Sequence, residues 1–116
     1  MSQDARDRAR AYYGGSGRDM AADCAALSAN PQGVLVLLPR LVALLKPVRH
    51  DRPQDWDRLA HSPASADAWY VHLLAGDLRL AMRLGAGLRR HDWLCFQRGA
   101  RNARLHRWPW RRLVKP

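Results

Sequence analysis

Two apolar runs, Val34–Leu38 and Leu41–Val48, follow each other in the chain and are separated only by Pro39 and Arg40. Apolar runs of this length, bounded by proline or glycine, form either buried strands or parts of a buried helix, and periodicity alone does not separate the two. We favour a strand from Arg40 to Val48, lying at a sheet edge or ending near its prolines. Because proline and charged residues interrupt it, the whole stretch is too short to cross a bilayer.

The first thirty residues have the pattern of two short polar helices. Residues 2–13 predict the first helix, and the glycines of segment 14–17 end it. Ser16 or Asp19 can cap the second helix, which reaches about Leu27. The glycine-rich segment 14–19 also resembles a loop that holds an anion, but a flexible connection between two helices is the favoured interpretation.

The second half of the chain predicts a strand followed by a helix. Segment 49–66 is polar and is expected to form a loop, whereas Ala68–Leu74 is aromatic and typical of a strand. Gly76 and Asp77 mark the junction, with Asp77 as the cap of a helix that extends from Leu78 to about Leu88.

Leucines recur at every fourth position of this helix, at residues 80, 84 and 88, and are expected to face the core. Trp93–Gln97 predicts the next strand. A turn at residues 99–102 and a return strand over 104–108 would complete a hairpin.

These elements predict an α/β (α+β) fold with a small, mainly antiparallel sheet, N-terminal helices and one central helix packed on the sheet. At 116 residues the chain is expected to form a single domain. Within it, residues 1–30 form the helices, 40–110 the α/β core and 111–116 a basic tail.

Positive charge is concentrated at one end of the chain. The formal net charge is +10, yet residues 1–66 hold nine Arg or Lys and seven Asp, whereas residues 88–116 hold nine Arg or Lys and one Asp. Tryptophans and one phenylalanine lie among these cations, and such a surface attracts phosphate backbones and acidic protein faces. The residues predicted to bind a polyanion are Arg89, Arg90, Arg98, Arg101, Arg104, His106, Arg107, Arg111 and Arg112.

Other kinds of site have weaker signals. His91 and Cys95 are four residues apart, but the chain has neither a second nearby cysteine nor a zinc-binding motif, so no metal site is expected. A nucleophile motif and a P-loop are both missing from the sequence, and no cofactor is predicted. Asp67, Asp77 and His106 are the acid or base residues nearest the basic half. His72 is expected to share a strand face with Tyr70 and to be half exposed.

The two cysteines, Cys24 and Cys95, lie in apolar surroundings, which favours buried, reduced thiols over a disulfide or a reactive thiol. The N-terminus is charged and unlike a secretory signal peptide. A cytoplasmic location in a bacterial host is therefore expected, and the oligomeric state is left open.

Two stretches carry a family resemblance: Ala68–Arg79, which contains the sequence A-G-D, and Trp93–Gly99. They resemble small proteins encoded in phages and prophages, in which a strand, a helix, a second strand and a basic hairpin follow one another. The same order is similar to the core of the GNAT acetyltransferase fold. That family's cofactor signature, Q/R-x-x-G-x-G/A, is missing, so the resemblance implies a binding role and transfers no coenzyme A residue.

The favoured function is that of a non-enzymatic accessory protein of the phage or mobile-element type. Its C-terminal hairpin would bind nucleic acid, a nucleoprotein or an acidic protein surface, and inhibition of a host defence complex is one form of this role. One alternative is a small RNA-binding or RNA-cleaving, toxin-like enzyme that uses His106 with Arg104 and Arg107. The other alternative is an acyltransferase of the GNAT type.

Overall fold

The computed structural model describes residues 4–16, 19–88, 91, 93–97 and 103–107. For Phe96, Gln97 and residues 103–107 it describes the backbone path. The elements in chain order are α1 (Ala5–Ser16), α2 (Met20–Ser28), β1 (Val34–Leu38), β2 (Leu41–Val48), a 3₁₀ turn (Pro53–Asp55), β3 (Ala68–Gly76), α3 (Leu78–Gly85) with a 3₁₀ extension (Ala86–Leu88), β4 (Trp93–Gln97) and β5 (Ala103–Arg107).

The strands form one sheet in the order β1-β2-β3-β4-β5. Neighbouring strands are antiparallel, except that β3 and β4 are parallel and are joined through α3. Two consecutive parallel strands need a long connection that returns the chain to the end of the sheet where the first strand began, because a tight turn joins only antiparallel strands. The predicted α+β fold with a mainly antiparallel sheet is therefore confirmed, and both apolar runs near Pro39 are strands.

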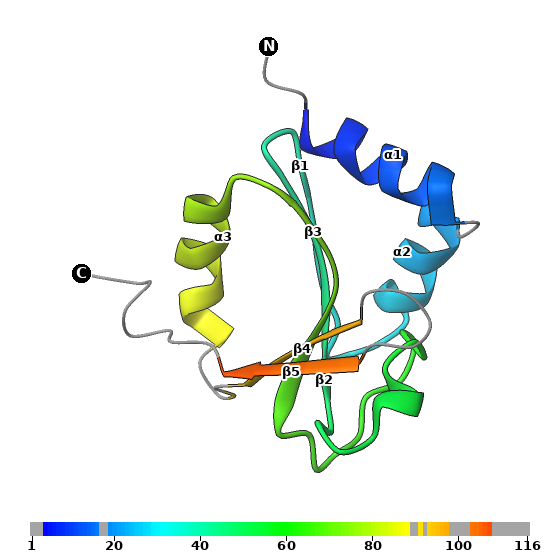
Figure 1. Ribbon diagram of the computed structural model, residues 1–116, viewed down its shortest axis with the longest axis vertical. Helices are drawn as coiled ribbons and strands as arrows, with labels where there is room; N and C mark the ends of the chain where they lie inside the picture. Colours follow the sequence, from blue (N-terminus) through cyan, green and yellow to red (C-terminus); the bar gives the residue numbers. More distant parts are fainter. Residues whose placement is uncertain (1–3, 17–18, 89–90, 92, 98–102, 108–116) are drawn as a thin grey trace.

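Helices cover both faces of the sheet. In Figure 1 α1 and α2 lie on one side of it and α3 on the other. The larger core lies under α1 and α2, where Tyr13 and Leu27 pack with sheet residues such as Leu44 and Tyr70. A smaller cluster on the α3 side contains Trp69.

His72 lies in the core, at a bulge in β3. Leu44 pairs with Leu73 and Leu45 pairs with Val71, so His72 is the extra residue of β3. The prediction that His72 is half exposed is wrong, because only 8% of its surface is accessible. The helices α1 and α2 cover this face of the sheet, which the sequence of β3 alone does not reveal.

The leucines at positions 80, 84 and 88 do not all face the core as predicted. Leu80 and Leu88 are half-buried, but Leu84 is 49% exposed, so the expectation that all three leucines face the core is wrong for Leu84. Gly85 is the buried residue of α3, so Leu84 lies at the edge of the helix face that meets the sheet. Spacing along a helix identifies a stripe, but it does not fix which edge of the stripe a sheet covers.

Replacing Leu84 by alanine is therefore expected to lower the free energy of unfolding by about 1 kcal/mol or less, as a partly solvated side chain should. The matched change Leu44→Ala, at a residue with no accessible surface, should cost about 2–5 kcal/mol. Urea unfolding of the two variants measures both values. Equal losses would show that Leu84 is packed as tightly as Leu44.

Candidate functional site

The two strands of the predicted basic hairpin are present, and its predicted turn over residues 99–102 lies outside the described residues. Strands β4 and β5 are antiparallel, and Arg104, His106 and Arg107 stand in register opposite Phe96, Leu94 and Trp93. The other predicted polyanion-binding residues lie outside the described residues: Arg89, Arg90, Arg98, Arg101, Arg111 and Arg112. The sheet thus places three of the nine predicted residues on one edge strand.

Arginines in the rest of the described chain are mostly paired with aspartates. Arg40 Nη2 lies 2.7 Å from Asp77 Oδ2, and Arg49 Nη2 lies 3.2 Å from Asp51 Oδ2. The remaining pairs are Arg10 with Asp7, Arg49 with Asp67, and Arg52 and Arg58 with Asp55. Residues 1–87 hold eleven Arg or Lys and nine Asp, so most of the excess of positive charge belongs to the C-terminal end.

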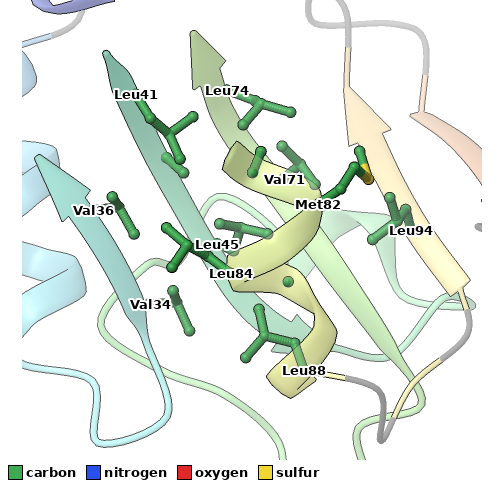
Figure 2. A pocket seen from close by; sticks show the side chains of 13 residues that line it. Val34, Val36, Leu41, Leu45, Val71, Leu74, Met82, Leu84, Leu88 and Leu94 are labelled. Atoms are coloured by element: carbon green, nitrogen blue, oxygen red, sulfur yellow. The ribbon is translucent and has the colours of Figure 1, made fainter. Parts of the chain in front are cut away.

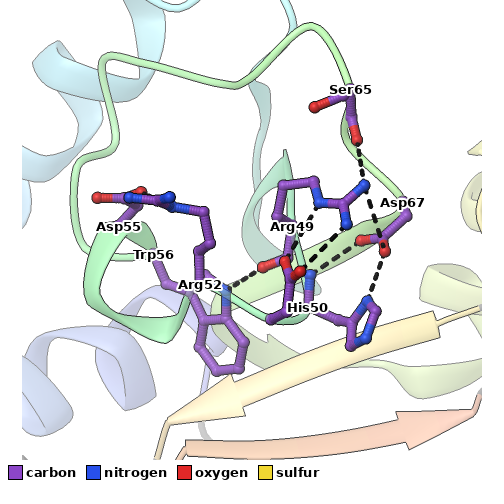
Figure 3. Close-up of polar contacts among 8 residues, drawn as sticks. Arg49, His50, Arg52, Asp55, Trp56, Ser65 and Asp67 are labelled. Atoms are coloured by element: carbon purple, nitrogen blue, oxygen red, sulfur yellow. Dashed lines mark hydrogen bonds and ion pairs between the residues drawn. The ribbon is translucent and has the colours of Figure 1, made fainter.

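The ends of the loop that joins β2 to β3 form a polar cluster, shown in Figure 3. The His50 amide donates to Asp67 Oδ1 at 2.9 Å, and His50 Nδ1 lies 2.5 Å from Asp67 Oδ2. Burial opposes ionisation of Asp67, but the amide and ring of His50, with Arg49, outweigh it and lower its pKa. Asp67 therefore stays ionised and orients the imidazole.

This cluster lies at the same end of the sheet as the start of β4. Asp67 directly precedes Ala68, which pairs with Trp93, and Trp93 in turn pairs with Arg107. An imidazole oriented by a carboxylate is the arrangement of a general base. However, Arg49 is held by Asp51 and Asp67, and two carboxylates beside one guanidinium disfavour a phosphate at this point. The cluster is better suited to closing the loop than to catalysis.

A second histidine pair is buried. His72 Nε2 lies 2.8 Å from Asp23 Oδ2, and the Tyr70 hydroxyl lies 3.3 Å from His72 Nδ1. Asp23 and His72 are both at most 9% exposed. The pair joins α2 to β3, and its burial favours a structural role. Sequence reasoning missed this pair, because the two residues are 49 positions apart.

Aspartates cap the N-termini of α2 and α3, positions at which other proteins bind anions. Asp19 Oδ1 accepts a hydrogen bond from the Ala21 amide, and Asp77 Oδ1 accepts one from the Leu80 amide. The Leu80 amide lowers the pKa of Asp77, and Arg40 acts in the same direction. Both carboxylates occupy the place that a phosphate would take at a helix N-terminus, which argues against phosphate binding there.

Cys24 is half-buried and Cys95 is buried, and both are free thiols. Burial raises the pKa of Cys95 to about 12, so this thiol is protonated at neutral pH. Among the described residues, no group of three or more His, Cys or acidic side chains could hold a metal ion. In that same part of the chain, no helix is long and apolar enough to span a membrane.

Comparison of the chain with protein-family models, with curated proteins and with solved structures found no match.

Proposed function

We propose that the protein binds a polyanionic partner through its basic C-terminal end and has no catalytic activity. The observation that carries this proposal is the uneven distribution of charge. Residues 88–116 hold eight more cations than anions, whereas residues 1–87 hold only two more, and several of their arginines form ion pairs with aspartates. An edge strand needs only a few charges to avoid self-association, and this excess is larger.

The residues of this end suit phosphate binding. Arginine is weakly hydrated, stacks on aromatic rings and donates two parallel hydrogen bonds to a phosphate or carboxylate. Contacts of this kind position a partner without reading its base sequence. Nucleic acid or a nucleoprotein is therefore the favoured partner, and an acidic protein surface is the alternative that the test must separate.

The capping of α3 supports a binding role over an acyltransferase. The Asp77 carboxylate, paired with Arg40, already accepts the amide of Leu80 at the start of α3. A cofactor phosphate would have to displace it. Coenzyme A that co-purified with the protein, or acyl transfer by the purified protein, would contradict the proposal.

The test compares two triple variants with the same loss of charge. In the first, Arg101, Arg104 and Arg107 become Gln. In the matched control, three exposed arginines of α1 become Gln: Arg6, Arg8 and Arg10. We expect the first variant to lose at least tenfold in affinity for a 20-base-pair duplex or a single-stranded RNA, because each lost contact removes counterion release. The control should lose much less, and both should keep their melting temperature within a few degrees.

Salt provides the second measurement. Affinity of the natural chain for the duplex should fall with a log–log slope near −0.9 per phosphate contacted, or about −4 to −5 for five contacts. Equal losses of affinity in the two triple variants would show that binding depends on net charge alone and not on the C-terminal arginines. An affinity that does not change with salt would contradict electrostatic binding, and binding of poly-aspartate in preference to both nucleic acids would identify a protein partner.

A further inference from the structure

An apolar cavity of about 110 Å³ lies between α3 and the sheet, on the face opposite α1 and α2 (Figure 2). Strands β1 to β4 supply side chains such as Val34, Leu45 and Leu94, and α3 supplies residues such as Met82 and Leu88. All the side chains that line it are aliphatic or that of methionine. A lining of this chemistry offers water no hydrogen-bond partner and favours apolar molecules.

Small residues create the space where helix and sheet face each other. Ala81 and Gly85 lie one turn apart on α3, and Ala43 lies in the middle of β2. All three line the cavity. Larger side chains at these positions would fill it, so the void follows from the residues that the chain places at its centre.

Hydrogen bonds tie α3 and its 3₁₀ extension to the sheet at both ends. At the N-terminal end the Asp77 amide donates to the Arg40 carbonyl at 2.7 Å. At the other end Trp69 Nε1 donates to the Leu88 carbonyl at 2.9 Å, and Trp69 is fully buried. A cavity whose walls cannot relax costs stability in proportion to its volume, and an apolar occupant restores the missing contacts.

The cavity is open at one side. In Figure 2 Leu84 lies on the side of α3 that faces β1, near Val34 and Val36. Leu84 lines the cavity and yet is 49% exposed, so it marks the mouth. Arg83 precedes it and is exposed, and α3 carries two arginines and no acidic residue. A negative headgroup that emerges past Leu84 would be within reach of the long Arg83 side chain.

We propose that this cavity binds the hydrocarbon chain of a short aliphatic carboxylate, with about four carbon atoms inside and the carboxylate outside near Arg83. A volume of about 110 Å³ fits about four carbon atoms, since a cavity of about 150 Å³ holds the six carbon atoms of a benzene ring. Aliphatic walls without an aromatic face favour a flexible chain over a stacked ring. This site is on the α3 face and is independent of the proposed polyanion binding.

The test measures binding of propanoate, butanoate and pentanoate by the shifts of the Leu88 and Leu94 methyl signals in NMR spectra. We expect affinity to rise about fourfold with each methylene group, as burial of hydrocarbon requires. Pentanol should bind as well, because the same chain enters the cavity. Methyl signals that do not move at any soluble concentration of these probes would overturn the proposal.

Two variants locate the chain and the headgroup. Ala81→Leu fills the cavity and should reduce pentanoate affinity more than tenfold, whereas Leu78→Ala, at an exposed residue outside the lining, should leave it unchanged. Arg83→Gln should weaken pentanoate roughly two- to fivefold at low salt and leave pentanol unaffected. If Ala81→Leu does not fold, the chain-length series still decides the question. Unchanged pentanoate affinity in Arg83→Gln would overturn the choice of a carboxylate.

Discussion

Replacing Gly76 by alanine is expected to destabilise the protein by about 3–5 kcal/mol, a large part of the stability of a small domain. Gly76 ends β3 with a φ of +123°, a conformation that residues with a side chain rarely adopt. A Cβ atom there would lie 2.2 Å from the Arg40 carbonyl oxygen and 2.8 Å from Ala5 Cβ. Both strain and collision therefore oppose the substitution.

Neither neighbour can move away easily. The Arg40 carbonyl accepts the Asp77 amide at 2.7 Å, and Ala5 is 2% exposed where α1 meets the sheet. The change should lower the melting temperature by about 10–20 °C. Gly87→Ala is the matched control, since a Cβ at Gly87 would meet no atom within 4 Å. Equal melting temperatures for the two variants would show that β3 can pass into α3 without a positive φ.

The second large effect is expected at Lys46, which is buried and has only 1% of its surface accessible to solvent. Its ammonium donates to the carbonyl oxygens of Asp55, Arg58 and His61 at 3.0, 2.5 and 2.8 Å. These three bonds use all its donors and hold the loop that joins β2 to β3. Lys46→Met keeps the length of the side chain but leaves three carbonyl groups without this donor.

Each buried polar group that loses its partner costs about 1–3 kcal/mol. Water can reach part of the loop and replace some of the lost hydrogen bonds, so we expect Lys46→Met to cost about 3–5 kcal/mol in total. Arg58→Met is the control: its side chain is 66% exposed and its ion pair is long, so the change should cost about 1 kcal/mol or less. Urea unfolding measures both. A Lys46→Met variant as stable as Arg58→Met would show that the carbonyl groups find other partners.

The pH dependence gives an independent check on Lys46. Burial lowers the pKa of Lys46 to about 8, against 10.5 in the unfolded chain. Between these values the unfolded chain binds the proton more strongly, so stability contributed by this group rises with pH. The stability difference between the natural chain and Lys46→Met should therefore widen from pH 8 towards pH 10. A difference that narrows over this range would show that the carbonyl groups outweigh burial.

Local patterns in the sequence determined most of the elements. The apolar run before Val48, the A-G-D junction at Gly76 and the paired segments around residues 93–107 were each visible within a few residues, because propensity, proline and glycine act locally. The distribution of charge was visible as well, since it needs no coordinates. These features predicted the α+β fold and the basic hairpin.

Tertiary structure decided what these elements contact. His72 is buried because α1 and α2 cover its face of the sheet. Lys46 is buried because a loop up to 15 residues away supplies three carbonyl oxygens. The pairs His50–Asp67 and Asp23–His72 span 17 and 49 positions, and no local pattern marks them. Leu84 lies at the mouth of a cavity for the same reason: the edge of a helix that a sheet covers depends on how distant segments pack.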